Sequence, residues 1–449
     1  MTGPSAAQTV PIRVGSRGPL GTAAPGQPTN LVGAERLLLT DAHLTLVGPA
    51  DPLDPNRATR AESLLDHVAR IGARPFGDLA LVDLVEQHGL TGHGGAHVPA
   101  ALKWRSALRS SGPLTVVANG AESEPVSGKD GTLLRQRPHL VLDGLALLAE
   151  ALGADRAVLW LHGDDAGARD AVLWAIEERR STLGSQHPVE VVNGPSHYLS
   201  GESSAIVRAL SGGPALPTAR RPVDPGAPTT LVHNVETLAR LALLARGHAV
   251  PASVLLSVLT PTGRRVVEAD RGTRLVDVLT GLGWPLDPPP AAVLLGGYGG
   301  QWASWEQVGR LTLDEGVMRA HGLSLGAGVV VPLPAGACGL TETAALTAYL
   351  ASMSARQCGP CLFGLPSIAD TLQRLAAGRA PAGELTRLHD DVRAVQGRGA
   401  CHHPDGVTRL VASAALCSVL SFATASTSSS SMGVRRTWTM DTEPSTPRR

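Results

Sequence analysis

Two thiols at C-x-x-C spacing, Cys358 and Cys361, lie in the segment SARQCGPCLFG at residues 354–364. Thiolates at this spacing serve redox dithiols, tetrahedral zinc sites and iron–sulfur clusters. A thioredoxin-like C-G-P-C motif places its nucleophile at a strand-to-helix junction in a βαβ context. Here the motif follows TAYLASMSARQ, a helical run that ends in polar residues. The context therefore favours a metal or cluster site over a redox dithiol, and the thiolates suit both zinc and iron.

A glycine-rich segment indicates a second kind of chemistry. In LTGHGGAHVPAALKWRSAL, residues 90–108, Gly92, Gly94 and Gly95 precede a helical pattern that carries Lys103. Closely spaced glycines let backbone N–H groups approach a ligand, and a helix N-terminus favours an anion. The segment predicts a site for a phosphate-bearing cofactor. It matches neither GxGxxG nor GxxxxGK[ST], so an ordinary loop is the alternative.

The composition bears on partners and on cellular location. The 449 residues carry 39 basic and 39 acidic side chains, which gives no electrostatic reason to expect nucleic acid or an anionic membrane as a partner. Five cysteines are too few for a disulfide framework, and the first residues lack an apolar signal core. The late apolar stretch LVASAALCSVLSFATA is shorter than a membrane span. We therefore expect a cytoplasmic protein without a membrane span.

The elements that position these residues follow an alternating pattern in the first half of the chain. From 60 to 247, short β-branched runs such as PLTVVANG and RAVLWLHG alternate with helical patterns such as HLVLDGLALLAEALGA. This alternation predicts parallel strands with helical crossovers, a Rossmann-like α/β domain. Ligands on such sheets lie at the carboxyl ends of the strands. VVANGAESEP and VVNGPSHYLSGES leave their strands at those ends.

The rest of the chain changes character. Residues 252–334 combine a hairpin pattern around PTG, one helix and later strands, which indicates a small α+β module. Residues 338–425 are helical with cysteines near helix ends, which suggests a helical bundle. Residues 1–35 and 426–449 are rich in Gly, Pro, Ser and Thr, and we expect them to be disordered. The expected fold class is α/β, with the Rossmann-like domain followed by the small module and the bundle.

Four signatures occur in the order of one known family. They are GHGGAHVPAALKW at 92–104, NGAESEPVSGKD at 119–130, YLSGESSA at 198–205 and HNVET at 233–237. The sequence resembles, over residues 60–420, the NADH-binding flavoprotein subunit (F type) of respiratory complex I, the NADH-quinone oxidoreductase. It is similar in the same way to relatives in NAD-linked hydrogenases and formate dehydrogenases. The resemblance implies an FMN-binding domain at 60–247, a β-grasp (SLBB) module at 252–334 and an iron–sulfur-binding domain at 338–425.

The resemblance also implies an FMN site. Carried over position by position, the residues expected to line the flavin and its phosphate are Gly92, Gly94, Gly95, Lys103, Asn119, Glu122, Glu124, Tyr198, Gly201, Glu202, Asn234 and Thr237. Lysine suits a phosphate, and amide and carboxyl groups can bond ring edges and ribityl hydroxyls. The structural alternatives are that Asn119 only shapes a strand-exit turn, that Glu122 and Glu124 are solvated, and that Tyr198 is core.

Departures from the family pattern concern the electron donor more than the flavin. The family's arginine is His93, and a family glycine and aspartate are His97 and Ala121. The family's aromatic residue before the proline is Val98, which would weaken stacking on the adenine of NADH. The second acid of the GEE pair is Ser203, and losing that carboxylate would remove repulsion against a 2′-phosphate. NADH and NADPH are therefore both candidate donors, and another donor is the alternative.

For the cysteines, the resemblance implies a [4Fe–4S] cluster. Against the family segment SCGxCxPCR and its distant fourth cysteine, Cys358, Cys361 and Cys401 match three ligands, whereas the first cysteine is Ala355. An external ligand or a [3Fe–4S] cluster would accommodate the gap. Protein candidates for the missing ligand are His402, His403, Asp405 and Cys338. Cys417 lies in an apolar helical pattern and is expected to be a small buried hydrophobe.

The implied activity is that of an NAD(P)H dehydrogenase-type oxidoreductase. Hydride from NADH or NADPH would reduce FMN, which would pass single electrons to the cluster and to a redox partner, such as a ferredoxin-like or complex I-type subunit. No side chain is expected to act as a catalytic acid or base. Association with the inner face of a membrane through partners fits this role. Two alternatives stay open: a degenerate scaffold or assembly subunit without nucleotide oxidation, and a flavin-independent dithiol or zinc protein.

Overall fold

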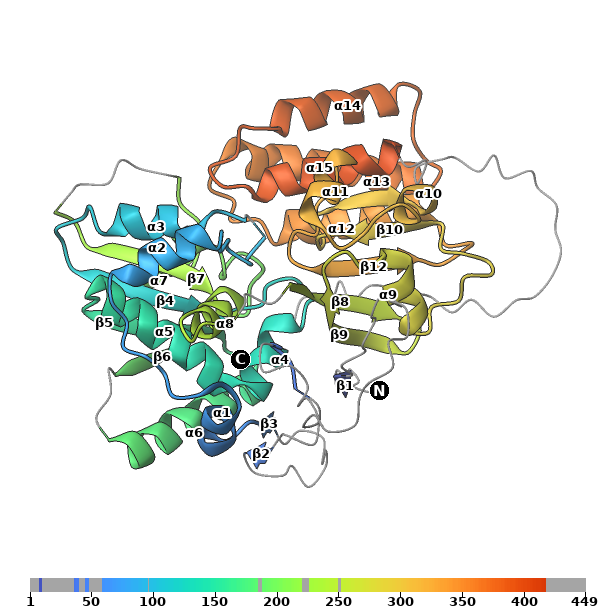
Figure 1. Cartoon of the computed structure of the whole chain (residues 1–449). Coiled ribbons are helices and arrows are strands. Elements are labelled where there is room, and N and C mark those ends of the chain that lie inside the picture. Colours follow the sequence, from blue (N-terminus) through green and yellow to red (C-terminus); the bar gives the residue numbers. More distant parts are fainter. Residues whose placement is uncertain are drawn as a thin grey trace, which may run out of the picture. The chain divides into compact units, whose positions relative to one another are not determined.

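The computed structural model describes residues 8–9, 36–39, 45–47, 59–95, 97–184, 188–219, 226–248 and 252–416 (Figure 1). The ends predicted to be disordered, 1–35 and 426–449, lie outside the described residues apart from a two-residue strand, and Cys417 also lies outside them. The chain divides into two compact units. The first comprises Met1–Trp284 and Arg310–Val330, and the second comprises Pro285–Gly309 and Val331–Arg449.

The secondary structure follows the alternation expected from the sequence. The strands are β1 Gln8–Thr9, β2 Thr45–Val47, β3 Thr59–Ala61, β4 Leu114–Asn119, β5 Arg156–His162, β6 Val189–Gly194, β7 Thr229–Asn234, β8 Ser253–Thr260, β9 Gly263–Asp270, β10 Ala292–Leu295, β11 Gln301–Ser304 and β12 Val329–Leu333. The helices of the first unit are α1 Leu64–Ile71, α2 Ala80–Gln87, α3 Ala100–Ala107, α4 Lys129–Gln136, α5 Pro138–Leu152, α6 Ala166–Leu183, α7 Ser203–Leu210, α8 Val235–Leu244, α9 Leu275–Gly281 and α11 Glu315–Ala320. Those of the second unit are α10 Trp305–Val308, α12 Gly339–Ser352, α13 Leu365–Ala376, α14 Glu384–Val395 and α15 His403–Leu416, with a π-helical turn at Pro360–Gly364.

A parallel sheet in the first unit confirms the Rossmann-like prediction. Its strands lie in the order β6-β5-β4-β7, and each pairs with its neighbour in parallel. Val116 of β4 packs in the large core, whereas the next residue, Val117, packs in a separate cluster with Ile206 of α7. Successive side chains of a strand point to opposite faces. Both faces of this sheet are therefore covered, as expected for strands joined by helical crossovers.

Helices α5 and α8 pack closely in this core. The sequence of α5 is apolar almost all round, and most of its residues are buried. A Cβ added at Gly144 would lie 2.0 Å from the carbonyl oxygen of Leu238 on α8. Only glycine permits the two helices to approach this closely. The helix ends at Gly153, whose left-handed backbone (φ 62°) caps its C-terminus.

The predicted hairpin around PTG is confirmed. Strands β8 and β9 pair antiparallel, with Thr260 opposite Gly263 across the two-residue loop 261–262. The start of β12 pairs in parallel with β8. The identity of residues 252–334 as an SLBB module stays a prediction.

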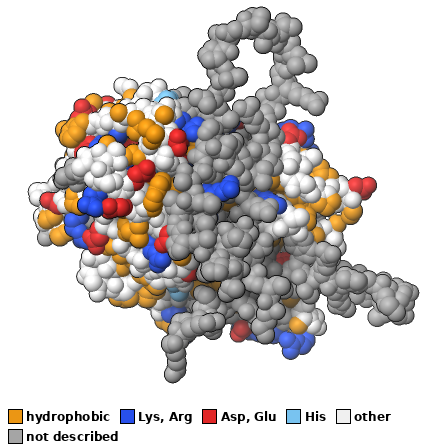
Figure 2. Space-filling view, turned by 90° about the horizontal axis from the view of Figure 1, so that it is seen from below, with side chains coloured by type: hydrophobic (Ala, Val, Ile, Leu, Met, Phe, Trp, Pro, Cys, Tyr) orange, Lys and Arg blue, Asp and Glu red, His pale blue; other side chains and the backbone are white. Residues whose placement is uncertain are grey.

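The second unit is mainly helical. Helices α12 to α15 follow one another from Gly339 to Leu416, and the hydroxyl of Ser413 on α15 accepts a hydrogen bond from the backbone of Trp302 on β11. Among the described residues, no helix combines the length and the apolar character needed to cross a bilayer. On the face drawn in Figure 2, basic and acidic side chains are interspersed rather than separated by sign.

Candidate cofactor site and cysteine cluster

The carboxyl ends of β4 and β7 bring two of the signatures together. Asn119 ends β4, Asn234 ends β7, and the two residues are directly opposite each other in the sheet register. Strands β5 and β7, which both follow β4 in the chain, lie on opposite sides of it. In open α/β sheets, ligands bind outside the carboxyl ends of the strands, at the position where the strand order reverses, as it does here beside β4.

A cavity of about 240 Å³ lies at this edge. Eight of the predicted flavin residues line it: Gly94, Asn119, Glu122, Glu124, Tyr198, Gly201, Glu202 and Asn234. Of the others, Thr237 lies next to this set, because its hydroxyl accepts a hydrogen bond from the backbone N–H of His93 at 3.0 Å. Gly92 holds the glycine loop closed by donating to the carbonyl of Val98 at 2.8 Å. Their roles in binding stay predictions.

The turn after β4 is held by its own side chains. Asn119 donates from Nδ2 to the carbonyl of Gly201 at 2.8 Å and accepts at Oδ1 from the N–H of Ala121 at 3.1 Å. It therefore shapes the strand-exit turn and ties together two walls of the cavity. A Cβ added at Gly201 would lie 2.8 Å from the Ser123 hydroxyl and 2.9 Å from the Ala121 carbonyl, so this close approach requires glycine.

Glu122 caps a helix at the floor of the cavity. Its carboxylate accepts hydrogen bonds from the N–H groups of Asp130 (3.2 Å) and Gly131 (3.1 Å) in the first turn of α4, and from the Ser127 hydroxyl. A carboxylate at this position satisfies helix N–H groups that have no partner within the helix. Glu122 is therefore fixed in place and is not a freely solvated acid.

A buried charge network adjoins the cavity. Lys129 Nζ donates to Asp130 Oδ1 at 2.6 Å and to Glu236 Oε2 at 3.0 Å, and Arg240 donates to Glu236 Oε1 at 2.8 Å. Burial opposes the charged form of Lys129, yet the adjacent carboxylates raise its pKa. Asn234 Nδ2 donates to Asp130 Oδ2 at 2.7 Å. These charged residues were not among those predicted to form the site. The available signal was that Lys129, one of only two lysines in the chain, lies within the second signature.

Lys103 lies apart from the other predicted flavin residues. It lines a second cavity of about 550 Å³, together with Arg109 and Ser203. Its Nζ donates to the carbonyl of Val232 at 3.1 Å, and burial lowers its pKa. Among the described residues, no acidic side chain lines this second cavity, whereas Glu122, Glu124, Asp130 and Glu202 line the first. A phosphate group therefore suits the second cavity better, and the two cavities are lined by consecutive residues, Glu202 and Ser203.

Two residues that line the first cavity each carry a buried polar atom without a hydrogen-bond partner among the described residues. His93 Nδ1 and Ser123 Oγ are buried and make no hydrogen bond within the described part of the chain. Buried polar atoms are nearly always paired. A polar ligand in the cavity would supply the missing partners.

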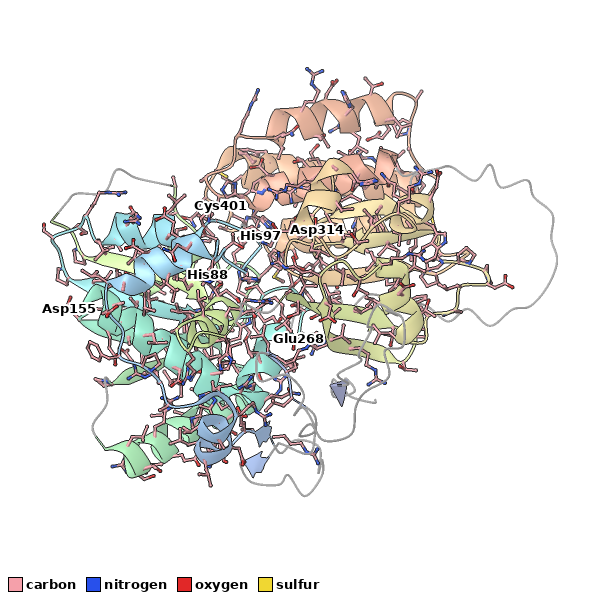
Figure 3. The ribbon with its side chains drawn as sticks, in the orientation of Figure 1. His88, His97, Asp155, Glu268, Asp314 and Cys401 are labelled. Carbon is pink, nitrogen blue, oxygen red and sulfur yellow. The ribbon has the colours of Figure 1, made fainter. Side chains whose placement is uncertain are left out.

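Three cysteines gather in the second unit. Cys361 lies in the π-helical turn Pro360–Gly364, and Cys358 lies just before that turn. Cys401, which is labelled in Figure 3, lies in the loop before α15. Burial raises the pKa of the Cys361 thiol to about 12, and the neighbouring thiols of Cys358 and Cys401 act in the same direction. The backbone N–H of Arg356 donates to the Cys361 sulfur. The three predicted ligands are thus neighbours.

The candidate fourth ligands have other environments. His403 Nε2 lies 2.8 Å from the carbonyl of Leu350, and Asp405 accepts a hydrogen bond from the Gly397 N–H at 2.7 Å. His402 is largely exposed, and Cys338 is exposed at the start of α12. Within the described ranges, no three His, Cys, Asp or Glu side chains are placed to hold a single metal ion.

Comparisons with known proteins identify both regions. Residues 85–243 match the family model of the Nuo51 FMN-binding domain, and residues 341–416 match that of the NADH-ubiquinone oxidoreductase-F iron–sulfur binding region. In both regions the chain is similar to F-type NADH-quinone oxidoreductase subunits.

Several F-type subunits are similar to this chain. The first of two such NADH-quinone oxidoreductase subunits in Rhizobium meliloti (strain 1021) is 27% identical over 360 residues, which are 72% of this chain and 80% of the relative. The F-type subunit in Aquifex aeolicus (strain VF5) is 32% identical over 177 residues, 36% of this chain and 42% of the relative. A crystal structure of an NAD+-reducing [NiFe]-hydrogenase in the H2-reduced state is similar with a TM-score of 0.66 and 27% identity. That similarity covers 75% of this chain and 61% of the hydrogenase chain.

The residues of this chain fit an FMN. His93 and Ser123, which line the first cavity, carry buried polar atoms without partners among the described residues. The second cavity is lined by Lys103 and Arg109 and, within the described ranges, by no acidic side chain. The cysteines fit three of the four ligands that the family's [4Fe–4S] cluster takes, and Ala355 offers no donor at the fourth position.

Proposed function

We propose that this chain is an electron-transfer flavoprotein that oxidises NADH or NADPH at FMN and delivers electrons to an iron–sulfur cluster and a partner protein. The observation that carries the proposal is the cavity at the β4 and β7 ends, where residues of all four signatures meet. FMN accepts two electrons as hydride and releases them one at a time.

The protein's residues hold and orient the cofactor in this proposal. The Asn119 bridge to Gly201 fixes the distance between two walls of the cavity. The Lys129–Glu236–Arg240 network neutralises charge beneath the cavity without placing an unpaired cation in it. Lys103, half-buried and bonded only to a carbonyl oxygen in the described residues, is left to pair with the phosphate.

The cysteines would hold the cluster that receives the electrons. Cys358, Cys361 and Cys401 each supply one thiolate, and the Arg356 N–H bond to the Cys361 sulfur would stabilise the electron-rich thiolate. The partner is expected to be a redox protein, either a ferredoxin-like protein or a complex I-type subunit. We propose that the chain acts in the cytoplasm, as a peripheral subunit held at the inner face of a membrane by its partners.

A scaffold or assembly subunit without nucleotide oxidation is the second candidate function. It is favoured by Ala355, which leaves three thiols where the family has four, and by Val98 and Ser203 at the expected donor positions. Anaerobically purified protein separates the two functions. The first predicts a flavin absorbance spectrum, bound iron and sulfide, and flavin bleaching by NADH or NADPH in stopped flow. A colourless protein, or a flavin inert to both nucleotides, would overturn the proposed oxidoreductase function.

A further inference from the structure

His93 occupies a position between two cavities. His93 lines both the first cavity and a smaller cavity of about 30 Å³, which is also lined by Leu255 and Leu325. Its backbone N–H is fixed by the Thr237 hydroxyl at 3.0 Å. This hydrogen bond fixes the backbone that carries the imidazole.

The charged groups around the ring decide which nitrogen carries the proton. Burial lowers the pKa of His93 to about 3, against the opposing effect of Glu236 and with the help of Arg240, Lys129 and His97. The ring is therefore neutral at physiological pH. Its Nε2 lies 3.8 Å from Glu236 Oε1, so a proton on Nε2 faces the carboxylate. That tautomer leaves a lone pair on Nδ1, the ring nitrogen that makes no hydrogen bond within the described residues.

We infer that His93 is a positioning residue whose Nδ1 accepts a hydrogen bond from an N–H or O–H group of the bound flavin. The inference rests on the proposed function, because it needs a flavin in the first cavity. An isoalloxazine N–H and a ribityl hydroxyl both offer such a donor. A buried acceptor without a partner costs free energy until a ligand donor reaches it, so FMN binding gains by satisfying it.

This assignment differs from the chemistry of the arginine at the same position of the family signature. A guanidinium donates only and stays charged, whereas this imidazole is uncharged and accepts. His93 thus offers a neutral acceptor at a position where the family signature has a charged side chain that can only donate. We expect the reduced, negatively charged flavin to be less stabilised here than beside an arginine.

Three variants distinguish the effect of hydrogen-bond acceptance at position 93 from the effects of side-chain charge and of packing. Each is tested by the dissociation constant of FMN from the otherwise intact, full-length protein, read from flavin fluorescence. His93→Leu should weaken FMN binding about tenfold, or about 1.4 kcal/mol. His93→Gln, which keeps a neutral acceptor, should stay within about threefold of wild type. His93→Arg, which cannot accept, should weaken binding about as much as His93→Leu and raise the flavin midpoint potential.

Matched controls complete the binding experiment. His88 is an exposed histidine on the turn after α2 (Figure 3), and its Nδ1 lies 3.0 Å from the Leu84 carbonyl. His88→Gln should change neither the dissociation constant of FMN nor the flavin midpoint potential. If His93→Arg binds FMN as tightly as wild type or more tightly, charge or packing sets the affinity and the inference fails. If wild type binds no FMN at all, the proposed function fails instead.

The tautomer gives a readout that is independent of affinity. With 15N-histidine labelling, the His93 signals, assigned by their loss in His93→Gln, should show a protonated Nε2 and an unprotonated Nδ1. On adding FMN, the Nδ1 signal should shift toward that of a hydrogen-bonded acceptor. A protonated Nδ1 in the FMN-bound protein would overturn the inference.

Discussion

The indole N–H of Trp104 donates to Nε2 of His233 over 2.9 Å, joining two residues that are 129 positions apart. Trp104 ends the first signature and His233 begins the fourth. The rings meet edge to face at an interplanar angle of 81°, and both are buried. Burial lowers the pKa of His233 to about 3, so a neutral ring accepts this bond. The bond fixes α3, with the glycine loop before it, against the end of β7.

Trp104→Phe should lower the free energy of unfolding by about 1–3 kcal/mol, because it leaves the buried His233 Nε2 without its donor. Urea denaturation followed by circular dichroism measures the change. Trp305→Phe, a half-buried tryptophan on α10, is the matched control and should cost less. Equal losses in the two variants would show that the indole contributes by packing alone.

Gly201→Ala should weaken FMN binding by at least about tenfold. The added Cβ would meet the Ala121 carbonyl at 2.9 Å, so the turn bearing Tyr198 and Glu202 must move away from Asn119. The measurement is FMN fluorescence quenching in the full-length protein. Gly309→Ala, where a Cβ meets nothing closer than 3.6 Å, should bind FMN like wild type. Tight FMN binding by Gly201→Ala would show that this turn does not form the cofactor wall.

Asp143→Asn should destabilise the first unit strongly. Asp143 on α5 is buried and accepts from His67 Nε2 (2.9 Å), Arg179 (2.5 Å) and Arg246. Removing the charge leaves two arginines without their shared carboxylate, which typically costs about 3–5 kcal/mol. Asp170→Asn, in a partly exposed pair with Arg169 at 3.2 Å, should stay within about 0.5 kcal/mol. Denaturant unfolding compares the two, and similar stabilities would contradict the prediction.

Stability should fall as the pH drops from 6.5 toward 3. Burial lowers the pKa of His93, His139 and His233 to about 3, so these rings are neutral when folded and take up protons on unfolding. Burial raises the pKa of Asp130 to about 6, which offsets one of these protons near pH 5. The unfolded chain then binds about two more protons, and the free energy of unfolding falls by about 2.7 kcal/mol per pH unit. Urea midpoints between pH 7 and pH 5 test this, and a flat profile would refute it.

Ala355→Cys should complete the cluster site. Wild-type protein, purified without oxygen, is expected to hold a cluster with three thiolate ligands, whose unligated iron is lost easily. The variant should raise the iron-to-protein ratio and convert an oxidised-state EPR signal of a three-iron cluster into a reduced-state signal of a four-iron cluster. Cys338→Ala should change neither quantity, because that thiol is exposed at the start of α12. Zinc without sulfide in wild type would exclude the cluster.

The sequence predicted the sheet well because its strands are unambiguous. β4 and β5 coincide with β-branched or apolar runs between helical patterns, and the hairpin at Thr260 and Gly263 follows from its turn residues. Placing the signatures at strand ends was enough to predict that they meet. The π-helical turn at Pro360–Gly364 has no periodic signal of its own and was not predicted.

Distant contacts explain what the sequence left undetermined. His93 is buried because Glu236 and Leu255, far along the chain, close around it. Lys103 follows the glycine loop in sequence, yet its place at the start of α3 turns it toward Val232 and away from the loop's cavity. Neither the burial of His93 nor the direction of Lys103 can be predicted from the neighbouring sequence, because each depends on contacts with residues far along the chain.

The charged side chains that line the first cavity, which includes Glu202, are mainly acidic, and those that line the second, which includes Ser203, are basic. This difference in charge gives a bound ligand a preferred orientation. If one ligand reaches both cavities, a molecule that is phosphorylated at one end only would bind in a single orientation, with its anionic tail toward Lys103 and Arg109. Riboflavin has the same ring system but lacks the phosphate that would bind in the second cavity. Discrimination between the vitamin and its phosphorylated form would then arise from Lys103 and Arg109 in the second cavity, beside a first cavity lined by four acidic residues.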